Sequence, residues 1–225
     1  MVRLLAFRYQ PELDYSALSE CSHLRTLVLQ GCEISKLDML SSLNELECLE
    51  VTQSEVAEAG DIVKLQSLTE LILDDTVLAG NKEQLELIFE NCPNIKKLTL
   101  VYGKRSEGLS NLDFLKKAGK LEELTLIGQP AMDYSAISEC YQLKSLGLLE
   151  CNISDFSILN GLENLESLNL TATNIPEAKD LLSLKNLKEL DIISTPLAEN
   201  EEQLALLYQR FPDIDIYTGM DDLGN

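Results

Sequence analysis

The segment GKRSEGLS, Gly103–Ser110, comes closer than any other part of the sequence to a motif that carries out chemistry. Its glycines and final serine match the spacing of the phosphate-binding loop G-x-x-x-x-G-K-S, in which backbone N–H groups and a lysine hold phosphate. Leu109 stands where that lysine belongs, and the βαβ pattern expected around such a loop is missing. The segment therefore indicates a turn in a linking repeat rather than a nucleotide site.

Residue types used in acid–base or nucleophilic catalysis do not gather elsewhere in the sequence. His23 is the single histidine, and the acidic pairs Asp74–Asp75 and Asp221–Asp222 are expected to be solvated charges. No nucleophile can be paired with a base from the sequence. We therefore predict that the chain is not an enzyme and uses no cofactor. Catalysis by residues that meet only in the folded protein is the alternative of a different class.

The cysteines bear on metal binding and on cellular location. The 6 cysteines form no C-x-x-C pair, and one histidine is too few for a zinc site that combines cysteines with a histidine cluster. The N-terminal stretch MVRLLAFRYQPELD lacks the apolar region and cleavage site of a secretory signal, and no apolar run is long enough to span a membrane. These features predict reduced thiols, no metal site and a cytoplasmic location.

The charge is strongly acidic, with 38 Asp and Glu against 18 Lys and Arg and a formal net charge of −20. Such a field repels nucleic acid and anionic lipid, and it speeds the approach of basic proteins. We therefore expect a protein partner with basic and hydrophobic groups, no nucleic acid and no membrane. Acidity that serves only solubility is the alternative.

The elements that position these residues are set by an internal repeat. The segment LRTLVLQGCEI, which starts at Leu24, recurs at a strict spacing of 22 residues, and a second set of copies starts at Leu121. A shift of 119 residues aligns 2–96 with 121–215 without a gap, and 39 of these 95 positions are identical. The chain is therefore a tandem duplication of a four-repeat module.

The repeat pattern is L-x-x-L-x-L, a turn, and then I-x-x-hydrophobic-x-x-L-x-x-L, as in NISDFSILNGLENLESLNLTATNI at residues 152–175. This pattern resembles the short 22-residue leucine-rich repeats of internalin-type bacterial proteins, and similar repeats occur in regulatory subunits of protein phosphatase 1. The resemblance implies an α/β fold, a curved leucine-rich-repeat solenoid with a parallel sheet on its concave face. Short helices and 3₁₀ turns would form its convex face. It also favours a bacterial source.

One turn position departs from the family pattern, which often has an asparagine there. In this chain small thiols and hydroxyls take its place, and we expect them to bond buried backbone groups more weakly. These residues are Cys32, Ser54, Thr76, Cys151, Thr173 and Thr195.

A longer interval between Leu68 and Ile95 predicts a true helix. Asn81 is a suitable N-cap, Gln84 at the N3 position gives a near capping box, and Pro93 ends the helix. A twin helix is predicted from about Glu201 to Arg210, as part of a C-terminal cap before a frayed tail. We thus expect one solenoid over residues 1–225, made of a first four-repeat module (1–94), a basic linking repeat (95–120) and a second module with its cap (121–225).

Alternation within the predicted strands decides which side chains face outward. Leu27 and Leu29 would face the core, while Thr26, Val28 and Gln30 would line the open face of the sheet. A register error of one residue would exchange the two faces. The predicted protein-binding site on the concave face combines apolar and mainly acidic side chains: Val28, Glu50, Glu70, Ile72, Asp74, Val101, Glu123, Ile127, Leu149, Asn169, Glu189, Asp191 and Ile193.

The linking repeat 95–120 is basic within an acidic protein. Seven Lys and Arg side chains stand against Glu107 and Asp113, so the segment carries a formal charge of +5 (7 − 2). We expect most of these charges to neutralise acidic neighbours at a solvated edge. The alternative is a secondary patch that binds an acidic segment of a partner or of a second copy, formed by Lys97, Lys104 and Arg105.

These observations predict a non-catalytic scaffold that binds a basic protein on its concave face, as a regulator or as a neutraliser of a toxin or enzyme. Two alternatives stay open. The chain could act as an enzyme-associated subunit such as a phosphatase regulator, or as a structural solenoid that assembles with itself, although the sequence gives no direct sign of self-association.

Overall fold

The computed structural model describes residues 2–10, 14–34 and 36–219. The chain divides into two compact units. Unit 1 extends to Leu109 and includes Asp113–Leu121, whereas unit 2 comprises Ser110–Leu112 and the chain from Glu122 onward. The proposed division into modules 1–94 and 121–225 around a linking repeat stays a prediction. Most of the predicted tail, with Asp221 and Asp222, lies outside the described residues.

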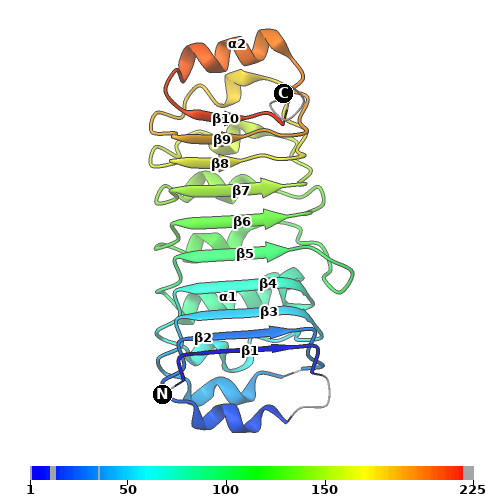
Figure 1. Ribbon diagram of the computed structural model, residues 1–225, viewed down its shortest axis with the longest axis vertical. Coiled ribbons are helices and arrows are strands. Elements are labelled where there is room, and N and C mark those ends of the chain that lie inside the picture. The colour runs from blue at the N-terminus through cyan, green and yellow to red at the C-terminus, as the bar shows by residue number, and fades with distance from the viewer. Residues whose placement is uncertain (1, 11–13, 35, 220–225) are drawn as a thin grey trace, which may run out of the picture. The chain divides into compact units, whose positions relative to one another are not determined.

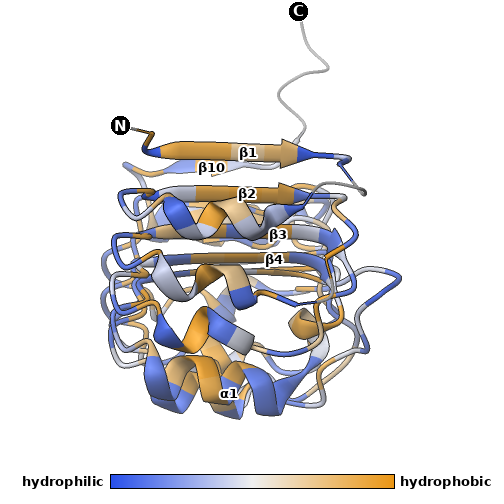
Figure 2. Cartoon of the chain, turned by 90° about the horizontal axis from the view of Figure 1, so that it is seen from below, coloured by the Kyte–Doolittle hydropathy of each residue, from blue (hydrophilic) through white to orange (hydrophobic). Residues whose placement is uncertain are grey.

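The described residues of unit 1 form parallel strands that pair in chain order (Figure 1). The strands are β1 (Leu4–Arg8), β2 (Thr26–Gln30), β3 (Cys48–Ser54), β4 (Glu70–Thr76) and β5 (Lys97–Val101). The helix and the 3₁₀ turns that connect the strands lie on one side of them, as Figure 2 shows for β1–β4 and α1. These connecting elements are η1 (Tyr15–Glu20), η2 (Asp38–Ser42), η3 (Gly60–Lys64), η4 (Leu78–Gly80), α1 (Lys82–Asn91) and η5 (Asp113–Lys117).

Unit 2 repeats this plan in its described residues. The strands are β6 (Glu123–Ile127), β7 (Ser145–Leu149), β8 (Ser167–Asn169), β9 (Glu189–Asp191) and β10 (Asp215–Tyr217), and again each pairs in parallel with the next. The connecting elements are η6 (Ser135–Glu139), η7 (Phe156–Leu159), η8 (Ala178–Asp180) and α2 (Glu201–Arg210). Parallel strands joined by 3₁₀ turns and few helices confirm the leucine-rich-repeat solenoid. No described helix is long and apolar enough to cross a membrane.

Stacked leucines form the core of each unit. In unit 1 the register places Leu27, Leu49 and Leu71 side by side on β2–β4, and all three are fully buried. Leu146, Leu168 and Leu190 form the same row on β7–β9. A single repeat has only one leucine in each row, so neighbouring repeats must stack to remove these side chains from water.

A left-handed residue recurs near the end of strands β1–β4. Tyr9, Gly31, Gln53 and Asp75 have φ between 47° and 58°, and they are 22 residues apart. Non-glycine residues adopt this conformation at a cost of roughly 1 kcal/mol or more. After Gly31, Gln53 and Asp75 the next side chain enters the interior, whereas Gln10, which follows Tyr9, is exposed. Gly128, Glu150, Ala172 and Ser194 are the equivalent residues of unit 2.

Six of these left-handed residues are followed by the predicted thiols and hydroxyls, whereas glutamines follow Tyr9 and Gly128. The Thr173 and Thr195 hydroxyls donate to the Leu170 and Ile192 carbonyls at 2.7 Å. Their buried equivalents also bond backbone groups: Cys32 and Cys151 donate to carbonyls, and Thr76 accepts from the Ala79 N–H. The predicted bonding to backbone groups is confirmed for these five positions, and its weakness relative to asparagine stays a prediction. Ser54 is the exception, because its buried hydroxyl has no partner among the described residues.

Both predicted helices are confirmed, with asparagine N-caps at Asn81 and Asn200. Each asparagine side chain accepts from the N–H three residues on, at 3.2 Å. The capping-box role of Gln84 is wrong, however, because its side-chain oxygen accepts from the Ala59 N–H of the preceding repeat at 2.9 Å. Gln203 bonds Ala178 in the same way. Each glutamine thus links its helix to the preceding repeat instead of completing a capping box at the helix N-terminus.

Replacing Asn81 by alanine should lower the free energy of unfolding by about 1 kcal/mol, because the helix loses the side-chain acceptor for its Gln84 N–H. Urea denaturation monitored by circular dichroism measures this change. Asn81→Asp is the matched control, since aspartate also caps helices and should retain most of the stability. Equal stability of Asn81→Ala and the wild type would contradict this account of the helix start.

Candidate functional site

The register of unit 1 confirms which side chains leave the core. Val28, Glu50 and Ile72 are adjacent on β2, β3 and β4, and each is half-buried between fully buried neighbours along its strand. We call the side of each unit's strands opposite the buried leucines the open sheet face. In unit 1 its remaining predicted site residues are Glu70, Asp74 and Val101, all half-buried.

The open sheet face of unit 1 is electrostatically negative around Cys48. The pKa of the Cys48 thiol is raised to about 12. Burial is the largest cause, and the negative charges of Glu70 and Glu50 also contribute. Burial likewise raises the pKa of Asp74, to which the neighbouring Asp75 charge adds. In both groups the raised pKa means that the negatively charged form is disfavoured at this surface. A cation placed here would relieve the repulsion.

Cys48 should therefore react slowly with iodoacetamide at pH 8, because a thiol with a pKa near 12 is almost entirely protonated there. Raising the pH toward 11 should accelerate the reaction about tenfold per unit, in proportion to the thiolate fraction. Glu70→Gln should lower this pKa and speed alkylation at a fixed pH, as measured by mass spectrometry of the Cys48 peptide. An unchanged rate in Glu70→Gln would contradict the assigned charge interaction.

In unit 2 a hydrogen-bond network fixes two carboxylates on the open sheet face. Asp191 accepts from the Thr171 hydroxyl at 2.8 Å and from the Asn169 side-chain amide at 3.2 Å. It also accepts from the Ile193 N–H at 3.1 Å. Glu189 on the same strand accepts from the Ser167 hydroxyl at 3.2 Å. These bonds hold both carboxylates in place before any partner arrives, which reduces the entropy lost on binding.

A hollow of about 330 Å³ lies beside these carboxylates, and its lining includes Gly147, Leu149, Asn169, Glu189 and Asp191. Gly147 lies between Thr125 and Asn169 on the neighbouring strands, and a Cβ at this position would lie only 3.0 Å from Leu149 Cδ1. Leu149 offers an apolar wall and the two carboxylates offer acceptors. The arrangement can accommodate an aliphatic stem that ends in a cation. The predicted Glu123 and Ile127 are the first and last residues of β6, and both are half-buried.

The predicted basic residues lie at the two ends of β5. Lys97 lies on β5 opposite Glu70, whereas Lys104 and Arg105 follow the strand. The Arg105 guanidinium binds Asp75 at 2.7 Å and Glu55 at 3.1 Å. The expectation that Asp75 is a solvated charge is wrong, because its side chain is only 16% exposed and also accepts from the Arg105 N–H.

The GKRSEGLS segment is held as a connecting turn. The Gly103 N–H donates to the Ser106 hydroxyl at 2.9 Å, and Asp75 clamps Arg105. Across the described ranges, no group of three or more His, Cys, Asp or Glu side chains could hold a metal ion. Every cysteine is a free thiol.

Sequence reasoning placed Asn169 and Asp191 in the site but missed the reason they belong together. They face each other across β8 and β9, and Thr171 completes the network. The 22-residue spacing between Asn169 and Asp191 was a usable signal, because equal repeat positions become neighbours in a parallel stack. Gly147, one period earlier, marks the hollow by the same rule.

No protein-family sequence profile matches the chain. Solved structures with the same fold are leucine-rich-repeat proteins, and the chain has the leucine-rich-repeat fold. An internalin (inlF) from Listeria monocytogenes has a TM-score of 0.58 and 16% identity, over 96% of this chain and 73% of that one. A leucine-rich-repeat protein from Leptospira interrogans has a TM-score of 0.68 and 18% identity, over 95% and 60%. The plant peptide hormone receptor RGFR1, solved in complex with RGF2, has a TM-score of 0.55 and 18% identity, over 86% and 36%.

Proposed function

We propose that the open sheet face binds another protein, whose contact surface carries basic and aliphatic side chains. The observation that supports this most is the pairing of half-buried apolar side chains with ordered carboxylates on adjacent strands. Ile72 lies beside Glu50 in unit 1, and Leu149 lines the same hollow as Asp191 in unit 2. Apolar anchors ringed by charges of one sign are typical of protein interfaces.

Strand propensity alone does not account for this composition. Valine, isoleucine and threonine favour strands, so Val28 or Ile72 would occur on the sheet without any partner. Aspartate and glutamate are depleted in strands, yet Glu50, Glu70 and Glu189 occupy open positions. The carboxylates therefore need another reason, and attraction of a basic partner supplies one. The RGFR1 receptor, which shares the fold, was solved with RGF2 bound.

The proposal is for a scaffold without catalytic activity that regulates or neutralises its partner. We place it in the cytoplasm of a bacterium, because free thiols suit a reducing compartment and the repeat class is the internalin type. Contact of Lys97, Lys104 and Arg105 with an acidic segment of the partner is a secondary part of the proposal. Lys104 tests that part better than Arg105, whose replacement would also release Asp75.

Affinity capture with the immobilised full chain tests the proposal. We expect a basic protein to be retained at 50 mM salt and to elute progressively as salt rises, since screening weakens exposed charge pairs. Light scattering of the chain alone over a concentration series tests self-assembly. Capture that does not depend on salt would contradict a basic partner. So would the failure to capture any protein together with a molecular mass of the chain that rises with its concentration.

A further inference from the structure

The internal duplication allows one inter-repeat turn to be compared with its own copy. In unit 2 the Asn174 side chain joins two neighbouring repeats through the backbone of Ile153. Its amide nitrogen donates to the Ile153 carbonyl at 2.8 Å, and its oxygen accepts from the Ile153 N–H at 3.1 Å. A carboxamide thus exchanges two hydrogen bonds with one buried residue, which is 1% exposed.

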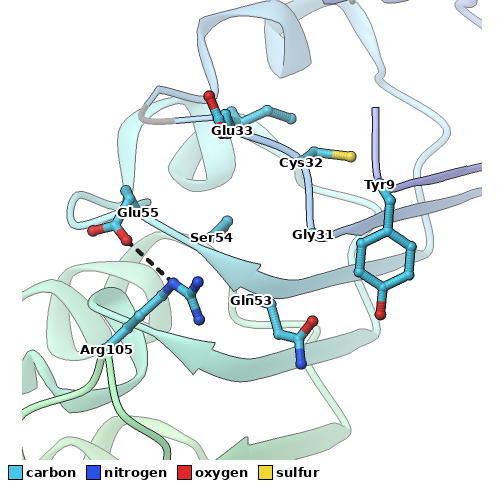
Figure 3. Close-up of a pocket in the computed structure, with 9 residues that line it drawn as sticks. Tyr9, Gly31, Cys32, Glu33, Gln53, Ser54, Glu55 and Arg105 are labelled. Carbon is cyan, nitrogen blue, oxygen red and sulfur yellow. Dashed lines mark hydrogen bonds and ion pairs between the residues drawn. The ribbon is translucent and has the colours of Figure 1, made fainter. Parts of the chain in front are cut away.

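In unit 1 the equivalent pair, 119 residues earlier, is Glu55 and Ile34. Glutamate cannot donate, and its carboxylate turns away from Ile34 to bind Arg105 at 3.1 Å (Figure 3). The Ile34 N–H donates instead to the Cys32 carbonyl. Among the described residues, no side chain gives Ile34 the two bonds that Asn174 gives Ile153.

A hollow of about 430 Å³ occupies this place in unit 1. Its lining includes Gly31, Ile34 and Ser54, with Tyr9 and Arg105 on opposite sides (Figure 3). Ser54 is 2% exposed, and its hydroxyl lacks a partner within the described residues. The equivalent Thr173 hydroxyl in unit 2 is satisfied by Leu170. A buried hydroxyl without a partner is unfavourable, and a ligand that bonds it would relieve that cost.

We propose that this hollow binds a carboxamide, the side chain of an asparagine or glutamine from another polypeptide. The incoming amide nitrogen would donate to the Ile34 carbonyl, as Asn174 does to Ile153. Its oxygen would accept from the Ser54 hydroxyl, or from the Ile34 N–H in place of the Cys32 carbonyl. The site lies where the strands turn, away from the open sheet face, so it is independent of the function proposed above.

A neutral ligand fits the charges around the hollow better than an ion does. Arg105 is the single cation in the lining, and its guanidinium already binds Glu55 and Asp75. A carboxylate would therefore meet Glu33 and Glu55 without a cation left to balance it. Main-chain amides could offer the same chemistry, and the experiment separates the two sources.

The test uses amide chemical shifts of the isotope-labelled full chain, titrated with N-acetyl-asparagine methylamide. We expect saturable shifts at Gly31 and Ile34 with a Kd on the order of 1 mM, as for a small ligand of modest efficiency. The aspartate analogue tests charge, and the alanine analogue tests main-chain amides alone. Both should leave these resonances unmoved. Equal shifts with either analogue, or none with the asparagine compound, would overturn the proposal.

Glu55→Asn provides a second test, because it should let unit 1 fill the hollow as unit 2 does. The variant should lose the response to the asparagine compound, and its thermal midpoint should rise by about 2–4 °C, because the Ile34 carbonyl gains a donor. Glu55→Ala also removes the carboxylate but fills nothing, so it should still respond. A Glu55→Asn protein that binds the compound as the wild type does would contradict the assigned site.

Discussion

Replacing Leu49 by alanine should lower the free energy of unfolding by about 3 kcal/mol, the typical cost of a cavity in a packed core. Leu49 is fully buried and lies in register between Leu27 and Leu71. Its loss would leave a gap between two leucine layers that the backbone hydrogen bonds of β2–β4 keep from closing. Urea denaturation followed by circular dichroism measures the change.

Two matched variants make this prediction specific to the stacking of repeats. Leu168→Ala, at the equivalent position of unit 2 between Leu146 and Leu190, should cost a similar amount. Glu50→Ala, on the next residue of the same strand, should change stability by no more than about 0.5 kcal/mol, since that side chain faces outward. A loss below about 1 kcal/mol for Leu49→Ala would contradict a core made of stacked leucines.

Arginine at Ile72 or Asp191 should weaken binding of the captured partner at least 30-fold, about 2 kcal/mol or more. At Ile72 the change removes an apolar anchor and sets a cation against basic groups. At Asp191 it removes a carboxylate that three hydrogen bonds hold in place. Titration calorimetry with the purified partner gives both Kd values.

The matched control is Asp38→Arg, which makes the same charge change on an exposed residue of η2. It should alter the net charge as Asp191→Arg does while leaving the Kd within about threefold, because distant surface charges are largely screened. Thermal unfolding of each variant checks that the fold survives. Equal weakening by Asp38→Arg would show that total charge, rather than the open sheet face, determines affinity.

The period of the sequence was sufficient to predict the stack. Leucines repeat every 22 residues, so their rows and the strand register follow from parallel pairing, as Leu27, Leu49 and Leu71 show. The alternation of Val28 and Leu29 then fixed the outward face. The helices were predictable because Asn81 and Asn200 offer side-chain caps at the point where the period lengthens.

Interactions between distant segments could not be read from the same pattern. Asp75 and Arg105 are thirty residues apart and in different repeat positions, so no periodicity links them. Gln84 satisfied the capping-box pattern, yet the free Ala59 N–H was the nearer donor in the fold. The left-handed conformation of residues such as Gln53 and Ala172 could not be predicted, because glycine is the usual sign of that conformation.

The most direct test of the open sheet face is protection of Cys48 from alkylation by the bound partner. Cys48 lies on that face in β3, whereas Cys21, which is also partly exposed, follows the outer turn η1. Both thiols can be followed in one mass spectrometric experiment on the wild-type chain. We predict that a saturating partner slows alkylation of Cys48 severalfold and leaves Cys21 unchanged. Protection of Cys21 with an unaltered rate at Cys48 would place the partner on the turns and contradict the proposal.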